Sequence, residues 1–286
     1  MFYLIDKPAW ISSFDVIRKL RKILSIKKMW HVGTLDPFAT GCLLIATWKS
    51  TKLIPLLESS KKEYIATIRF DGKTDSYDTE TPVEKVSTDS FSWKSNSEIE
   101  AFLLSQKKQT PPKYSAIHIH GKRSYELARK GKDFVLEERN IEVFSVEVIY
   151  KNGYELQVRM LVSSWCYMRS FWPILWSFFW SEWWYLIALE RTKIDWKYMT
   201  CEIENACQID KINSIPISNL FHTIHTYEIS DEAMKDIIDW RKWLDNLIPT
   251  WLNNEEIFFL FNKNRPYTSL CKNENGSLLI LKNDVD

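Results

Sequence analysis

The segment HVGTLDPFATG, residues 31–41, constrains the fold of this chain more than any other. Gly33, Pro37 and Gly41 supply backbone conformations that other residues hold only at a cost, so the segment predicts a tight, fixed turn. Asp36 lies inside that turn. One interpretation is an aspartate that only hydrogen-bonds its own backbone, as Asp does in many turns. The other is a carboxylate held rigidly as a nucleophile, and segments elsewhere in the chain favour it.

Apolar periodicity predicts a mixture of helices and strands. Residues 13–26 have apolar side chains near helical spacing after a Ser cap candidate, which indicates a helix with a basic outer face. Its apolar set is Phe14, Ile17, Leu20 and Ile23. The alternation of residues 64–70, with Tyr64 on the inner side, predicts a strand. Further strands are expected at 141–149, 155–162, 257–261 and 278–281, and further helices at 124–130 and 231–247.

The length of 286 residues suits one large domain and one small one. Periodicity is lost over residues 209–219, which contain Pro216, so we expect domains at 1–215 and 216–286. Five cysteines without a paired metal spacing indicate a reduced, cytoplasmic setting and no structural zinc. Nothing before Asp6 is long enough to be a signal peptide.

The net charge of +1 hides an uneven distribution. Residues 18–28 contain six basic side chains and no acid, and residues 107–132 contain eight basic side chains and one acid. Such clusters form either a positive patch for phosphates or ordinary solvated faces. Acids gather instead toward the C-terminal end, from Asp231 to Asp245, which favours two regions with different roles.

Four further segments accompany the Asp36 turn in a fixed order between residues 6 and 194. They are DKPAWISSFDVIRKLRK (6–22), KKEYIATIRFDGKTDSYDTE (61–80), TPPKYSAIHIHGKRSYELARKG (110–131), and SSWCYMRSF (163–171) followed by LERTKI (189–194). Together with the turn, these segments resemble the motifs of the TruB family of tRNA pseudouridine synthases.

The resemblance implies an α+β fold, with a mixed, mainly antiparallel sheet and flanking helices, plus a small C-terminal domain. It implies that uridine 55 in the T arm of tRNA is isomerised to pseudouridine, a rearrangement that needs no cofactor and no metal. The expected protein is a cytoplasmic monomer whose partner is tRNA and which does not contact a membrane. Residues 216–286 are interpreted either as a PUA-like RNA-binding domain or as a domain that only braces the catalytic one.

The resemblance also implies roles for the residues of a catalytic centre. Asp36 matches the family's catalytic carboxylate, which either attacks the ribose or removes a proton from it. Arg169 matches the arginine that pairs with that carboxylate, and a planar guanidinium can hold a carboxylate through two bonds. Tyr64 matches a tyrosine that stacks on the target base and assists proton removal from the new carbon link. The alternative for Tyr64 is a core tyrosine on an alternating strand.

Other matches imply contacts with substrate. Tyr167 matches a second tyrosine that touches substrate, and Leu189 an apolar pocket wall, although core packing explains both equally well. His31 matches a residue that enters the RNA when the target base is turned out. Asp78 is expected to support the site through hydrogen bonds, and Lys7 to contact phosphate or pack locally.

Two departures from the family's pattern stand out, one at the last motif and one along the whole chain. Ser164 and Cys166 occupy positions where the family commonly has lysine and threonine, so a basic contact is expected to be missing. Tryptophan also stands repeatedly at positions where the family usually has glycine. The positions are Trp10, Trp30, Trp48, Trp165, Trp176 and Trp180.

Composition supports a hypothesis about these tryptophans. The chain has 7 Gly and 14 Trp in 286 residues, whereas ordinary glycine usage is about 7%. We therefore hypothesise that a UGA codon meaning glycine has been read as tryptophan. The alternative is a protein truly rich in tryptophan that stacks RNA bases. The hypothesis turns the apolar stretch at 171–189, a marginal membrane span as written, into an amphipathic helix that ends in a loop.

Two other functions remain open from the residues alone. One is a non-catalytic protein that binds or folds tRNA through the same cleft, against which the retention of Asp36, Tyr64 and Arg169 argues. The other is a related synthase that acts on another RNA.

Overall fold

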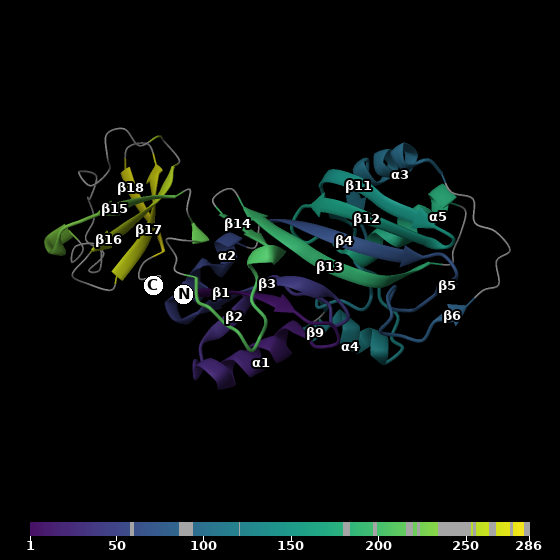
Figure 1. The fold of residues 1–286 in the computed structure, drawn as a ribbon, viewed down its shortest axis with the longest axis horizontal. Helices are drawn as coiled ribbons and strands as arrows, with labels where there is room; N and C mark the ends of the chain where they lie inside the picture. Colours follow the sequence, from purple (N-terminus) through teal and green to yellow (C-terminus); the bar gives the residue numbers. More distant parts are fainter. Residues whose placement is uncertain are drawn as a thin grey trace.

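An eight-stranded sheet forms the larger part of the molecule in this computed structural model (Figure 1). The structure describes residues 1–57, 60–85, 94–119, 121–179, 184–196, 199–215, 220–221, 224–233, 253, 256–262, 267–274 and 277–282. The strand order is β1-β3-β13-β4-β12-β11, with β2 on β3 and β14 on β13. Its strands are β1 (Phe2–Lys7), β2 (Met29–Val32), β3 (Thr40–Thr47), β4 (Lys61–Arg69), β11 (Val143–Asn152), β12 (Glu155–Val162), β13 (Tyr185–Trp196) and β14 (Met199–Glu202).

Every printed pairing in this sheet is antiparallel except that of β3 with β13, so the α+β expectation of a mixed, mainly antiparallel sheet is confirmed. Short hairpins lie outside it. They are β5 (Gly72–Lys73) with β6 (Glu84–Lys85), β7 (Lys108–Gln109) with β10 (Arg139–Asn140), and β8 (His118–Ile119) with β9 (Lys122–Arg123). The helices are α1 (Ser13–Leu24), α2 (Ile54–Leu57), α3 (Asn96–Leu104), α4 (Ser124–Arg129) and α5 (Phe171–Phe179), with 3₁₀ turns at Trp48–Leu53, Met168–Ser170 and Ile203–Asn205.

Helix α1 begins where the sequence predicts. The Ser12 side chain accepts the Asp15 N–H and the Asp15 carboxylate accepts the Ser12 N–H, which satisfies two donors that the helix start leaves unpaired. The predicted apolar face is partly wrong, because Phe14 and Ile23 are exposed while Val16 is buried. A strict three-residue spacing drifts around a helix of 3.6 residues per turn, so its outer members leave the buried stripe.

The stretch at 171–189 was predicted as one helix followed by a loop, and that prediction is wrong in its second half. Helix α5 ends at Phe179, and β13 begins at Tyr185 and continues to Trp196 as an inner strand of the sheet. In the described part of the chain, no helix combines the length and apolarity needed to cross a membrane.

A second, four-stranded sheet lies at one end of the molecule (Figure 1). It consists of β15 (His225–Glu228), β16 (Ile257–Asn262), β17 (Tyr267–Glu274) and β18 (Ser277–Lys282), in that order. The strands expected at 257–261 and 278–281 are thus confirmed, whereas residues 234–247 of the expected helix lie outside the described residues. The apolar cluster beneath this sheet is shared with the larger one. Phe221 packs edge-on against both Phe2 of β1 and Phe259 of β16.

Among the described residues, three tryptophans have backbones in the left-handed region. The φ angles of Trp10, Trp48 and Trp165 are 67°, 46° and 67°, and their side chains are 66%, 42% and 62% exposed. For residues with a Cβ this conformation costs about 1–2 kcal/mol, whereas glycine adopts it freely. The backbone at these positions therefore agrees with the glycine hypothesis. Trp30 differs, because it lies in β2 with an ordinary strand conformation and its exposed ring stacks on His31.

Candidate active site

The loop that carries Asp36 joins β2 to β3. The Asp36 carbonyl accepts the Ala39 N–H at 3.1 Å, which closes a turn around Pro37. Just before the turn, the Ser13 hydroxyl at the start of α1 accepts the Leu35 N–H at 2.9 Å and donates to the Leu35 carbonyl at 3.1 Å. Because the backbone on each side is bound to a regular element, the Asp36 side chain projects from a fixed base.

Two glycines at the ends of the loop allow it to lie close to β13. Gly33 has a φ of +76° and Gly41 a φ of +101°. A Cβ atom on Gly41 would lie 2.3 Å from the Arg191 carbonyl oxygen and 2.9 Å from the Arg191 nitrogen. The glycine at position 41 is therefore required both by its dihedral angle and by the backbone of the parallel neighbour.

Arg169 holds the Asp36 carboxylate through two parallel bonds. Its Nε donates to Asp36 Oδ2 at 3.0 Å and its Nη2 to Asp36 Oδ1 at 2.9 Å. The remaining guanidinium hydrogens reach the carbonyls of Ser76 and Tyr114 at 3.0 and 2.9 Å. The Arg169 side chain is 5% exposed and that of Asp36 28%, so the cation is buried and the carboxylate remains open to solvent.

Asp78 lies behind this pair and is fully buried. Its carboxylate is 3.2 Å from Arg169 Nη1, and its Oδ1 accepts the Ser76 hydroxyl at 2.6 Å and the Glu80 N–H at 2.8 Å. Burial raises the pKa of Asp78, while Arg169 and these hydrogen bonds oppose that rise. Burial disfavours the charge on Arg169, but Asp36 and Asp78 outweigh it and its pKa is raised. Asp78 therefore orients the arginine that orients Asp36.

Lys7 binds the other side of the loop. Its ammonium is fully buried and donates to the carbonyls of Pro8, Ile11 and Pro37 at 2.9, 2.8 and 3.1 Å. Burial lowers its pKa to about 8, against the attraction of Asp36. The expectation of local packing is thus correct and that of a phosphate contact is wrong, because three main-chain oxygens occupy the ammonium.

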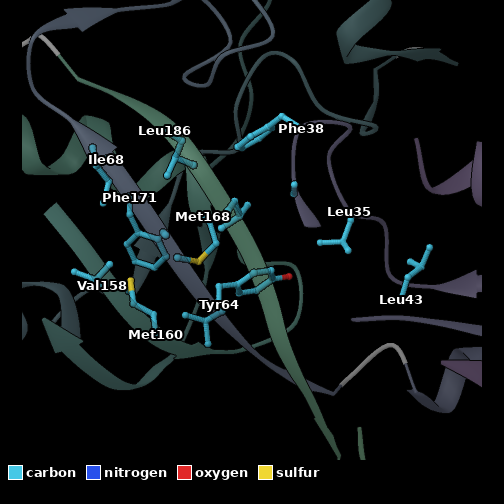
Figure 2. Close-up of a cluster of buried hydrophobic side chains, with 14 of the residues drawn as sticks. Leu35, Phe38, Leu43, Tyr64, Ile68, Val158, Met160, Met168, Phe171 and Leu186 are labelled. Carbon is cyan, nitrogen blue, oxygen red and sulfur yellow. The ribbon is translucent and has the colours of Figure 1, made fainter. Parts of the chain in front are cut away.

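Tyr64 lies on β4 at the edge of the main apolar cluster. Figure 2 shows its ring beside Met168 and its hydroxyl directed toward the side of the loop that holds Leu35. The residue is 7% exposed, and burial raises its pKa while the Arg191 guanidinium opposes the rise. Tyr64 is thus a core residue whose polar end faces the loop, and its role toward a substrate base stays a prediction.

Tyr167 and Leu189 are held by different contacts. The Tyr167 main chain is bound by the Gln109 side chain, which accepts its N–H at 2.7 Å and donates to its carbonyl at 2.8 Å. Burial raises the Tyr167 pKa, and the Asp36 charge adds to the rise. Leu189 is buried on β13, opposite Ala66 of β4, within the main apolar cluster.

His31 belongs to the strand that leads into the loop. It lies on β2 opposite Ile45 of β3, and its ring stacks on Trp30 with centroids 5.3 Å apart. Burial and the nearby Arg191 lower its pKa to about 4, so the ring is neutral at physiological pH. Among the described residues, His31 Nδ1 is buried without a hydrogen-bond partner.

Sequence reasoning missed one cation entirely. Arg191 on β13 is fully buried, and its guanidinium contacts the carbonyls of Gly33, Thr34 and Cys42. The motif LERTKI contains this arginine, but apolar periodicity gives no sign that an arginine faces the core. Beside Ser164 lies another buried cation, Lys62, whose ammonium donates to the Ser164 hydroxyl at 3.3 Å and to the Ser60 carbonyl at 3.0 Å.

The described residues contain no cluster of His, Cys, Asp and Glu suited to a metal ion. All five cysteines are free, and burial raises the pKa of Cys42 and Cys201 to about 12. The chemistry that the site does offer is that of one carboxylate, held in a fixed direction and open to solvent on one side. Such a group can act as a nucleophile or as a base.

Comparison with known proteins gives one family. The sequence model described as "TruB family pseudouridylate synthase (N terminal domain)" matches residues 21–168, just over half of the chain. A protein from Thermus thermophilus named tRNA pseudouridine synthase B is 43% identical over 150 residues, which are 51% of this chain and 47% of that protein. One of the same name from Fusobacterium nucleatum is 41% identical over 169 residues, 58% of each chain. The chain therefore spans about half the length of the curated relatives it matches.

Solved structures share the fold over nearly the whole chain. A structure titled "Crystal Structure of a Cbf5-Nop10-Gar1 Complex" matches with a TM-score of 0.67 and 18% identity, over 99% of this chain and 84% of that one. Another, "Structure of H/ACA RNP bound to a substrate RNA containing 2'-deoxyuridine", matches with a TM-score of 0.64 and 17% identity, over 100% and 83%. At such identities the likeness establishes the fold.

Proposed function

Because this chain belongs to the TruB family of pseudouridylate synthases, we propose that it isomerises uridine 55 in the T arm of tRNA to pseudouridine. The observation that carries the proposal is the pair of Asp36 and Arg169, in which a buried guanidinium directs a solvent-open carboxylate. The curated relatives named tRNA pseudouridine synthase B support the choice of tRNA.

The reaction is an internal rearrangement of one nucleotide. The bond between N1 of the base and C1′ of the ribose breaks, the base turns, and C5 bonds to C1′. A proton is gained at N1 and one is lost from C5, so atoms and electrons balance within the substrate. Asp36 acts at the ribose, either by attack on C1′ or by removal of a ribose proton.

The other side chains take roles that suit their positions. Tyr64 stacks on the base and assists the loss of the C5 proton, since one side chain supplies both a ring and a hydroxyl. Asp78 keeps Arg169 in its direction by the 3.2 Å ion pair. Tyr167 and Leu189 line the pocket. His31, neutral and half-buried, enters the space left when the base turns out of the RNA.

RNA is recognised through its shape and its unpaired bases, so the protein needs a positive surface beside the site. Helix α1 supplies one, because Arg18, Lys19 and Lys22 are exposed on the helix whose first residue, Ser13, binds the Asp36 loop. We assign residues 216–286 to a PUA-like domain that adds RNA contacts, and we expect a cytoplasmic monomer.

The experiment is conversion of unmodified tRNA transcript by the Asp36→Asn variant, with pseudouridine mapped chemically at each uridine. We expect the rate to fall at least about 1,000-fold while tRNA affinity stays within about threefold, because the amide keeps the shape of the side chain and loses its charge. The matched control is Asp75→Asn, which changes an exposed carboxylate three residues from Asp78.

Loss of binding with unchanged conversion of the bound fraction would contradict the catalytic role of Asp36. A wild-type protein that folds and binds tRNA without forming pseudouridine would instead favour a tRNA-binding protein. Modification of another RNA but not of tRNA would favour the related synthase.

A further inference from the structure

Arg191 is the largest fully buried side chain of the described residues, and it lies directly beneath the Asp36 loop. Its Nε donates to the Cys42 carbonyl at 2.7 Å, its Nη2 to the Gly33 carbonyl at 3.2 Å and its Nη1 to the Thr34 carbonyl at 3.4 Å. These acceptors lie at both ends of the loop: Gly33 and Thr34 precede Asp36 in the sequence, and Cys42 follows it. One side chain therefore ties the entrance and the exit of the loop to a single point on β13.

The charge of Arg191 is not neutralised by an acid. Within the described part of the chain, no carboxylate forms an ion pair with this guanidinium, and main-chain oxygens are its acceptors. A buried cation is costly unless it is paired and hydrogen-bonded. A hydrophobic side chain could fill the space at lower cost, so the presence of an arginine indicates that its donors and its charge are used.

The strand register places Arg191 between the two groups of the proposed chemistry. It is the parallel partner of Gly41 on β3 and the antiparallel partner of Tyr64 on β4. Its guanidinium interacts with the Tyr64 hydroxyl and favours the ionised form of that group, against the larger effect of burial. The same guanidinium thus binds the loop of Asp36 and, from the position paired with Tyr64, acts through its charge on the Tyr64 hydroxyl.

We infer that Arg191 is a positioning residue, which sets the Asp36 loop and the Tyr64 hydroxyl in one fixed relation and holds a positive charge beside that hydroxyl. This inference deepens the proposed function and rests on it. Arg191 acts through its acceptors and not by contact with the RNA, because no part of its side chain is exposed.

The test uses the full chain with Arg191→Ala and Arg191→Lys, and it has two readouts. Single-turnover conversion of saturating tRNA measures the chemical step, and tRNA affinity is measured separately. Hydrogen exchange of the amides of residues 33–41 measures the order of the loop without any substrate. The matched control is Arg159→Ala, which removes an exposed arginine on β12 paired with Glu147 at 2.6 Å.

For Arg191→Ala we expect a rate at least about 100-fold lower, affinity within about threefold, and exchange of the loop amides at least about tenfold faster. Guanidinium chloride, at a concentration far below the denaturing range, should raise the rate of Arg191→Ala at least about tenfold by entering the vacated space. Urea has a similar shape without the charge and should restore none. Arg191→Lys keeps the charge but loses the planar, branched guanidinium. We therefore expect this variant to retain a higher rate than Arg191→Ala, and its loop amides to exchange as fast as those of Arg191→Ala.

Unchanged rate and exchange in both variants would overturn the inference, as would equal rescue by urea and guanidinium. If Arg191→Ala does not fold, Arg191→Lys decides alone. A rate at least tenfold lower with unchanged affinity supports the inference, and a wild-type rate overturns it. A wild-type protein that forms no pseudouridine would end the proposed function, whereas the exchange of residues 33–41 would still report on the role of Arg191 in the loop.

Discussion

Gly41 at the rear of the Asp36 loop and the tryptophans of two exposed turns all have positive φ angles, but their surroundings are opposite. At the rear, Gly41 has a positive φ and a hydrogen atom where any Cβ would overlap the Arg191 backbone. At the exposed turns, Trp10 and Trp165 have positive φ angles and large side chains that stand in solvent. The first position excludes every other residue by lack of space. The second tolerates a tryptophan, which fits there only at the cost of backbone strain.

The difference separates two reasons for a glycine. A position closed by neighbouring atoms must be glycine for the fold to form. At an open position with a positive φ, glycine only increases the stability of the fold, because it relieves backbone strain. The arrangement of the site is therefore compatible with tryptophan at the open turns. The same strain shows why a glycine at each open turn would fit the backbone better.

The largest expected effect is at the rear of the loop. Gly41→Ala should lower the free energy of unfolding by about 4 kcal/mol, since the strain of a positive φ adds to a backbone overlap. Denaturant unfolding measures the change. The matched control is Gly121→Ala, whose φ is +80° but around which no atom lies within 4 Å of the added Cβ. We expect about 1 kcal/mol there, and equal losses at the two glycines would break the comparison.

A smaller effect is expected at His31, which is half-buried on β2 and stacks on the exposed Trp30. Its pKa is about 4 in the folded protein, below the ordinary value of 6.5, so the unfolded chain binds the proton more readily. Stability should therefore be highest above pH 6.5 and should fall as the pH decreases from 6.5 toward 4. His31→Gln should reduce this dependence in urea unfolding measured across that range. His118→Gln, at an exposed position, should not, and an unchanged slope in the His31 variant would contradict the prediction.

The smallest effects are expected at the open turns. Trp165→Gly should raise the free energy of unfolding by about 0.5–1 kcal/mol, because relief of left-handed strain exceeds the entropy that glycine adds to the unfolded chain. Trp30→Gly is the matched control and should have the opposite sign, since Trp30 has a strand conformation and packs on His31 and Phe14. Both are measured by thermal and denaturant unfolding of the recombinant protein.

The glycine hypothesis itself is tested by the intact mass of the native protein. A mass that requires glycine at the tryptophan positions would support it, and a mass that matches fourteen tryptophans would refute it.

Local signals in the sequence predicted local structure well. The Ser cap before residue 13 and the alternation from Tyr64 to Phe70 gave α1 and β4, because capping and periodicity act within a few residues. The strand β13 was missed because its first residues continue an apolar run that looks helical. Its partners β3 and β4, which make it a strand, lie far away in the chain.

In the site, too, local features could be predicted from the sequence and long-range contacts could not. The turn around Asp36 is visible in its glycines and proline, whereas its pairing with Arg169 followed only from the family resemblance. The ion pair that the structure shows joins residues 133 positions apart, which no local pattern encodes. Neither local patterns nor the family resemblance predicted the role of Arg191, because a buried arginine bound to main-chain carbonyls has no periodic pattern and no charged partner in the sequence.

The place of β13 between β3 and β4 has a consequence for how the protein is made. During synthesis the Asp36 loop leaves the ribosome long before Arg169 and Arg191, which bind it across 133 and 158 residues. Pairings of such long range carry a large loop-closure cost and form slowly. The nascent chain therefore holds a carboxylate without its cations until β13 inserts between two strands made earlier. The contacts that fix the Asp36 loop are complete only when this strand closes the sheet.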